Sequence, residues 1–191
     1  MRSSEDGGVD RSVVERAARG DRDAFALLTA RSIDRMYRIA ERILRDPEAA
    51  RDATQQALVE AWRGLPSLRD PDRWEAWTYR LLVRAAYREA GRGQPFVGRV
   101  RLLANDAIVT DAAGAIADRD ELERAFRSLS PEHRAVVVLH HYEGLPLTEV
   151  AAALGIPAGT ARSRLHNALR TLRAALEAER RTPSDRKDRA G

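Results

Sequence analysis

The chain has 191 residues, of which 43% are apolar and 32% charged, with few aromatic residues and a formal net charge of +4. This composition predicts a helix-rich protein of one or two small domains, with any nucleic-acid contact confined to a local surface. The absence of cysteine excludes disulfides, thiolate nucleophiles and cysteine-ligated metals. Because no apolar run is long enough to span a bilayer and the first residues are too polar for a signal peptide, the expectation is a cytoplasmic protein without membrane insertion.

The first third of the chain carries helical periodicity after a polar tail, residues 1–9. Apolar residues at helical spacing between Asp10 and about Leu44 predict a short helix followed by a longer one. Gly20 separates the two, and Asp21 is a suitable N-cap for the second.

A third helix is predicted over Pro47–Arg63, because proline fits the first helical position. One side is mainly alanine and is expected to pack inward. A second side is polar with aliphatic relief, which favours either a protein-docking surface or simple exposure to solvent. That second side comprises Asp52, Gln55, Gln56, Val59 and Trp62.

The stretch Gly64–Asp72 is predicted to be a loop from its glycine, proline and aspartate content, and a fourth helix follows over Asp72–Gly91. Arginines and aromatic residues fall within one third of this helix's circumference, a pattern typical of single-stranded nucleic-acid binding by phosphate contact and base stacking. Burial of Trp77 and Tyr87 in a small core is the alternative interpretation. The face comprises Arg73, Trp77, Arg80, Arg84, Tyr87 and Arg88.

Glycines and low complexity over Gly91–Asp118 predict a linker between two domains. Beyond it, a helix is predicted over Glu121–Ser128, and Ser130 with Pro131 opens another that Gly144 stops. No strand pattern occurs in the sequence, so the predicted fold class is all-α.

The stretch from Leu145 to Arg173 predicts a helix-turn-helix. Thr148 is the expected cap of its first helix, Gly155 ends that helix in a left-handed conformation, and the second helix starts at about Ala158. An apolar stripe gives the second helix a buried back, while its front and flank carry four arginines and no carboxylate, which suits a DNA major groove rather than plain solvent. The front and its flank comprise Arg162, Ser163, Arg164, His166, Asn167, Arg170 and Arg173, and the amides of Gly159 and Thr160 can bind a phosphate.

Three histidines, His133, His140 and His141, invite a metal-site interpretation. Glu143 is the only carboxylate near His140 and His141, and the chain has neither a glycine-rich phosphate loop nor a nucleophile–base pair. The prediction is therefore that the protein binds no metal, needs no cofactor and is not an enzyme.

Three motifs together resemble bacterial RNA polymerase sigma factors, in particular the small extracytoplasmic-function (ECF) group of the sigma-70 family. DPEAARDATQQALVEAWRGL and RWEAWTYRLLVRAAYREAGR are similar to two helices of sigma region 2, and GTARSRLHNAL lies in a close match to region 4. The resemblance implies two helical domains joined by a flexible linker. The implied segments, in chain order, are an N-terminal tail and short helix at 1–20, region 2 at 21–92, a linker at 93–120, region 4 at 121–178 and a polar tail at 179–191.

The resemblance also implies partners and roles. The surface containing Asp52 and Gln55 would dock on the clamp helices of core RNA polymerase, with region 4 on the flap. The loop, through Ser67 and Arg69, and the arginine–aromatic helix would melt and hold the promoter −10 element as a single strand. The helix from Ala158 would read the −35 element, and an anti-sigma factor is a further implied partner. The chain departs from the family pattern at five positions: Gln56, Leu58, Arg84, Arg88 and Asn167.

A stand-alone helix-turn-helix regulator is the alternative function. It would need a first domain that dimerises or senses a ligand, and the first 92 residues show neither a heptad seam nor a pocket signature.

Overall fold

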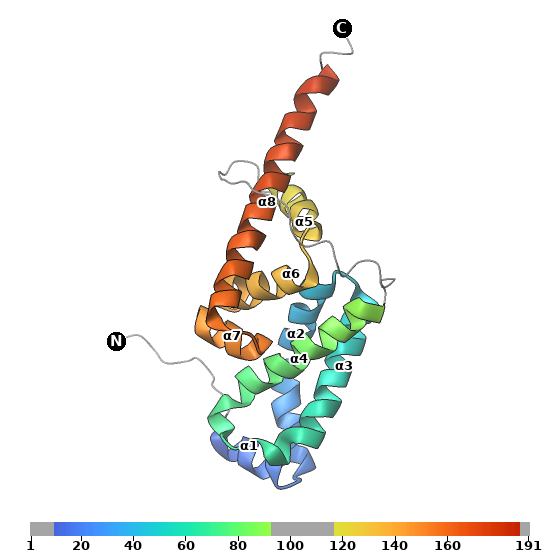
Figure 1. Cartoon of the computed structure of the whole chain (residues 1–191). Coiled ribbons are helices and arrows are strands. Elements are labelled where there is room, and N and C mark those ends of the chain that lie inside the picture. The colour runs from blue at the N-terminus through green and yellow to red at the C-terminus, as the bar shows by residue number, and fades with distance from the viewer. Residues whose placement is uncertain (1–9, 93–116, 188–191) are drawn as a thin grey trace, which may run out of the picture. The chain divides into compact units, whose positions relative to one another are not determined.

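The computed structural model describes residues 10–92 and 117–187, and throughout these ranges the regular elements are helical. The chain divides into two compact units, one built on α1 to α4 and the other containing α5, α6, most of α7 and all of α8 (Figure 1). The predicted all-α class is confirmed. The predicted tail at 1–9 and most of the predicted linker, residues 93–116, lie outside the described residues.

Helices α1 (Arg11–Ala18) and α2 (Arg22–Leu44) both begin at an aspartate cap. The Asp10 carboxylate accepts a hydrogen bond from the Ser12 amide, and the Asp21 carboxylate accepts one from the Ala24 amide. Gly20 between them has a φ of +91°, a conformation that side chains beyond glycine rarely adopt. The predicted break and the predicted Asp21 cap are confirmed.

Helix α3 (Pro47–Gly64) packs along α2 through small side chains. Asp46 caps it by accepting hydrogen bonds from the Glu48 and Ala49 amides. The inward face is completely buried and consists of Ala50, Ala53, Ala57 and Ala61. Alanine brings two helix backbones close together, so this face acts as a close-approach seam rather than as a bulky core.

Helix α4 (Trp74–Arg92) begins two residues later than predicted, because the preceding loop contains two 3₁₀ turns. These are η1 (Leu65–Ser67) and η2 (Pro71–Arg73), and the Asp70 carboxylate caps η2 by accepting a hydrogen bond from the Asp72 amide. The first residue of α4, Trp74, is fully buried and joins a core cluster with Leu28, Leu65 and two residues of α1.

The second unit contains α5 (Ala117–Arg127) and α6 (Pro131–Val137), both of which pack against α8 (Ala158–Lys187). Ser130 caps α6 by accepting a hydrogen bond from the His133 amide, as predicted. Helix α6 continues into a π-helical turn, η4 (Val138–Tyr142), where the Glu143 amide donates to the Val138 carbonyl at 3.0 Å. Gly144, with a φ of +70°, ends it at the predicted stop.

Three expectations for this unit are wrong. Helix α5 begins at Ala117 instead of Glu121, so the last four residues of the predicted linker are helical. Helix α7 (Leu147–Leu154) already includes Thr148 in its first turn, where the Pro146 carbonyl accepts the Glu149 and Val150 amides, so Thr148 is not the cap. Helix α8 runs on to Lys187 instead of fraying after Glu177, so most of the predicted polar tail is helical. Strong helix formers occupy residues 174–181 (AALEAERR), which favours this continuation.

Candidate nucleic-acid interfaces and docking surface

The helix-turn-helix has the predicted turn and the predicted buried back. Gly155 adopts a φ of +66° after α7, and α8 starts at Ala158. The apolar stripe along α8 is buried at four positions and half-buried at Leu169 and Leu176. The buried positions are Ala161, Leu165, Ala168 and Leu172. Burial of this stripe determines which face of α8 remains outward.

The outward face of α8 exposes some of its predicted DNA-reading residues more than others. Arg162, Ser163 and His166 are exposed, and the remaining members of the predicted set are half-buried. The half-buried members are Thr160, Arg164, Asn167, Arg170 and Arg173. The exposed residues lie in the first three turns, the part of a recognition helix that approaches base edges most closely.

The first turn of α8 is open and contains no acidic residue. A side-chain carbon added at Gly159 would meet no atom within 4 Å among the described residues. The Ser163 hydroxyl donates to the Thr160 carbonyl at 3.0 Å, so it meets a ligand chiefly as an acceptor. A helix N-terminus of this kind, with no carboxylate in the sequence from Ala158 to Arg173, attracts a phosphate.

In the first unit, the arginines of α4 are more exposed than its aromatic residues. Arg80, Arg84 and Arg88 are exposed, whereas Trp77 and Tyr87 are half-buried. Trp77 packs against the core cluster, and its ring centroid lies 5.8 Å from that of Trp74. The core interpretation therefore holds for part of the Trp77 surface.

The predicted strand-binding arginines also differ in whether a carboxylate neutralises their charge. Arg88 Nη2 lies 2.5 Å from Glu60 Oε1 of α3, and Arg73 Nε lies 3.4 Å from Asp70 Oδ2. Arg69, Arg80 and Arg84 have no carboxylate within ion-pair distance among the described residues, and all three are exposed. A phosphate would meet these three as unneutralised cations, but would have to compete with a carboxylate at Arg88.

The loop between α3 and α4 holds the two remaining predicted residues of this set. Ser67 and Arg69 are both exposed. The Ser67 hydroxyl donates to the Gly64 carbonyl at 2.6 Å, which fixes its side chain at the end of α3. Arg69 therefore carries the freely available charge of the loop.

All five residues of the predicted docking surface on α3 are exposed: Asp52, Gln55, Gln56, Val59 and Trp62. This surface borders an apolar groove of about 650 Å³ between α2 and α3. Trp62 lines it, with its ring packed edge-on against Phe25 at a centroid distance of 4.9 Å. Gln56 donates to Glu60 at 3.2 Å, so this amide is already engaged within α3.

Sequence reasoning missed the α2 side of this groove. Phe25, Ile33 and Tyr37 line it, although their spacing predicted only that they belong to a helix. Ile33 is in fact 41% exposed. Periodicity identifies the apolar side of a helix but does not show which part of that side its neighbour leaves uncovered.

The histidines lie in a different arrangement from a metal site. Over the described ranges, no group of three or more histidines and carboxylates is positioned to hold an ion. His140 Nδ1 donates to the Leu145 carbonyl at 2.8 Å, which ties η4 to the chain entering α7. Of the helices described, none is long and apolar enough to cross a membrane.

Comparison with known families identifies both units. The model "Sigma-70 region 2" matches residues 28–94, and the model "Sigma-70, region 4" matches residues 125–174. These matches cover the helices that carry the docking surface, the arginine–aromatic face and the helix-turn-helix.

Individual relatives agree with the family models. The chain is 36% identical to the RNA polymerase sigma-E factor of Streptomyces avermitilis over 75% of this chain and 80% of that protein. It is 30% identical to the ECF RNA polymerase sigma factor SigK of Mycobacterium ulcerans, over 87% and 93% of the two chains. Among solved structures, CnrH in complex with the cytosolic domain of CnrY superposes with a TM-score of 0.66 at 27% identity, covering 89% of this chain and 98% of that one.

These findings define a two-domain transcription initiation factor. The chain belongs to the sigma-70 family of RNA polymerase sigma factors, and within it to the ECF group.

Proposed function

We propose that this sigma factor binds core RNA polymerase and directs it to promoters by dividing recognition between its two units. The observation that carries the proposal is the pair of outward, arginine-bearing helix faces, one on α8 and one on α4, each in a separate compact unit. The α8 face suits duplex DNA, and the α4 face with its loop suits a single strand. The protein supplies specificity to the polymerase and is not itself an enzyme.

In the second unit, the start of α8 reads the −35 element. Arg162, Ser163 and His166 are exposed where a recognition helix meets base edges, and Asn167 lies beside them. Arg170 and Arg173 lie two turns further along and contact the phosphate backbone. Arg164 on the flank and the amide of Thr160 add phosphate contacts.

In the first unit, the loop and α4 melt and hold the −10 element. Arg69, Arg80 and Arg84 contact the strand as unneutralised cations. Ser67 and the outer surfaces of Trp77 and Tyr87 complete the predicted contact set, and Arg73 and Arg88 have weaker roles because carboxylates already pair with them. We also propose that this first domain begins at α1, since α1 shares its core.

The α2–α3 groove and the exposed residues beside it form the surface for the clamp helices of core polymerase, and region 4 meets the flap. Asp52 and Gln55 supply polar contacts there, while Val59 and Trp62 supply apolar area. An anti-sigma factor is the second protein partner that the family resemblance implies, and the solved relative CnrH is likewise bound to another protein, the cytosolic domain of CnrY. Working with polymerase on promoters places the protein in the cytoplasm, at the nucleoid when active.

The decisive experiment compares the isolated chain with its complex with core polymerase. Specific protein–DNA interfaces bury about 1,000–2,500 Å², and one small helix-turn-helix supplies the lower part of this range at most. We expect weak binding of duplex promoter by the isolated chain and promoter-specific run-off transcription by the complex, since polymerase holds both units on DNA together. Tight sequence-specific footprinting by the isolated chain would instead support the stand-alone regulator.

A further inference from the structure

The loop between α3 and α4 is anchored at both ends in one apolar cluster. Leu65 opens the loop and Trp74 closes it, and their exposed fractions are 0% and 1%. The same cluster contains Val14 and Ala17 of α1, and α1 contacts both η1 and η2. Between its two anchors the loop exposes Ser67 and Arg69. Helix α1 is therefore part of the floor on which the exposed part of the loop lies.

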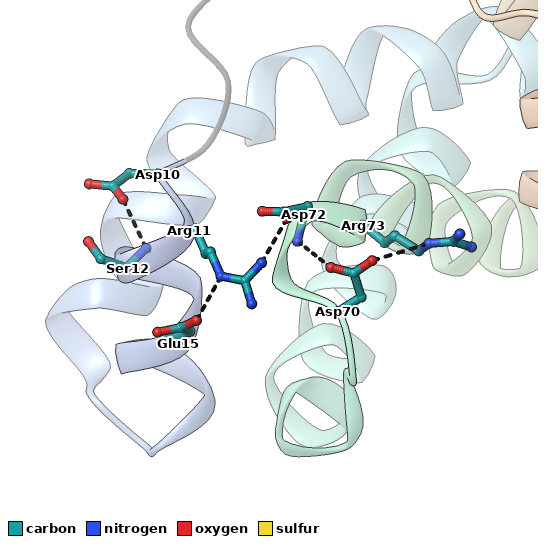
Figure 2. A network of polar contacts seen from close by, with 7 residues as sticks. All are labelled: Asp10, Arg11, Ser12, Glu15, Asp70, Asp72 and Arg73. Atoms are coloured by element: carbon teal, nitrogen blue, oxygen red, sulfur yellow. Dashed lines mark hydrogen bonds and ion pairs between the residues drawn. The ribbon is translucent and has the colours of Figure 1, made fainter.

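A chain of polar contacts continues from α1 across the surface of this loop, as Figure 2 shows. Arg11 Nη1 lies 2.7 Å from Asp72 Oδ2, and Arg11 Nε lies 2.9 Å from Glu15 Oε1. The Asp72 amide donates to Asp70 Oδ1 at 3.1 Å, and Asp70 Oδ2 lies 3.4 Å from Arg73 Nε. One guanidinium thus connects α1 to η2.

This network also changes the electrostatics of the loop. Asp70 and Asp72 are two carboxylates in a segment proposed to lie against a phosphate backbone, which they would repel. Arg11 pairs with Asp72 and Arg73 pairs with Asp70. The hydrogen bond to Glu15 and the charge of Asp72 raise the pKa of Arg11, so its guanidinium is charged throughout the physiological pH range. The paired loop therefore presents Arg69 with its acids compensated.

We propose that α1 is a positioning element for −10 recognition, in which Arg11 holds the strand-reading loop through Asp72. The inference rests on the proposed role of this loop. It goes beyond the family match, because the region 2 model begins at residue 28, after α1 has ended. Arg11 acts through the loop and makes no DNA contact of its own.

The test replaces Arg11 and uses a matched control. Arg11 and Arg22 are both exposed arginines at the first position of a helix, directly after an aspartate cap. Arg22 has no carboxylate within ion-pair distance among the described residues. Each variant, Arg11→Glu and Arg22→Glu, is assembled with core polymerase and transcribes a promoter pool randomised at the −10 and −35 elements.

We expect Arg11→Glu to reduce base discrimination at the −10 element by about two- to fivefold, the range an exposed ion pair can supply. The −35 preference and core affinity should stay those of the parent. Arg22→Glu should leave −10 discrimination, −35 preference and core affinity unchanged. Arg11→Lys replaces the guanidinium with a single ammonium group, which cannot contact Glu15 and Asp72 through separate nitrogens. This variant should give an intermediate loss of −10 discrimination. The charge exchange Arg11→Glu with Asp72→Arg should restore −10 discrimination.

Two outcomes would overturn the inference. The first is unchanged −10 discrimination in Arg11→Glu together with a loss in Arg69→Ala, which would leave the proposed loop function intact and remove α1 from it. The second is a parallel loss at −10 and −35, or no rescue by the charge exchange, which would show general damage rather than positioning. If Arg69→Ala itself leaves −10 discrimination unchanged, the proposed function of the loop fails as well.

Discussion

The ion pair between Arg88 and Glu60 predicts that neighbouring arginines of α4 contribute unequally to strand binding. Arg84 is an exposed cation without a carboxylate in reach among the described residues, whereas Arg88 Nη2 lies 2.5 Å from Glu60 Oε1. The side chains of Arg88 and Glu60 are 44% and 29% exposed, so solvent screens their attraction and the pair is worth at most about 1 kcal/mol. If Arg88 leaves Glu60 to contact a phosphate, the loss of the ion pair offsets much of the free energy gained from the phosphate contact.

The perturbations are Arg84→Ala, Arg88→Ala and Glu60→Gln. Each phosphate neutralised on a single strand contributes about −0.7 to the slope of log affinity against log salt. Arg84→Ala should make the slope shallower by about 0.7, and Arg88→Ala should change it by much less. Glu60→Gln frees Arg88 and should make the slope steeper by up to about 0.7.

The assay is binding of a fluorescent −10 oligonucleotide, in the non-template sequence, to the complex with core polymerase over a series of salt concentrations. Because Gln56 donates to Glu60 beside the docking surface, core affinity is measured for each variant as a control. Equal slope changes for Arg84→Ala and Arg88→Ala, with no effect of Glu60→Gln, would refute the reasoning that the ion pair limits Arg88.

Three further predictions test the other surfaces. Arg162→Ala should relax base preference at one or two −35 positions and cost about 1–3 kcal/mol of binding free energy. Arg173→Ala should weaken binding to all sequences alike and reduce the salt slope by about one. Transcription from a randomised promoter pool at two salt concentrations separates the two effects, and the reverse pattern would mean a different docking of α8. Asp52→Arg combined with Gln55→Ala should lower core polymerase affinity at unchanged helical content by circular dichroism, and normal assembly would exclude this surface. Burial lowers the pKa of His133 below 6.5, so the unfolded chain takes up the proton more readily. The stability that this group contributes should be complete above about pH 6.5 and lost as pH falls through the lowered value, and urea unfolding of His133→Gln should show a weaker pH dependence.

Sequence alone was sufficient for most of the helical framework. Helix starts at Asp21, Asp46 and Ser130 depend on a cap side chain that bonds an amide two or three residues away, and the stops at Gly144 and Gly155 depend on a left-handed backbone. Both are local effects, determined within one turn of helix, and are therefore readable from neighbouring residues. The helix-turn-helix was predictable for the same reason.

Tertiary structure decided which members of each face are available. Trp74 and Trp77 are equally apolar, yet packing of α1 and α2 buries the first completely and leaves part of the second outside. Glu60 compensates Arg88 from 28 residues away, and Arg11 reaches Asp72 across 61 residues. Phe25 packs against the core cluster and also lines a groove. These contacts join residues distant along the chain, so they depend on how helices pack together, which local periodicity and capping do not determine.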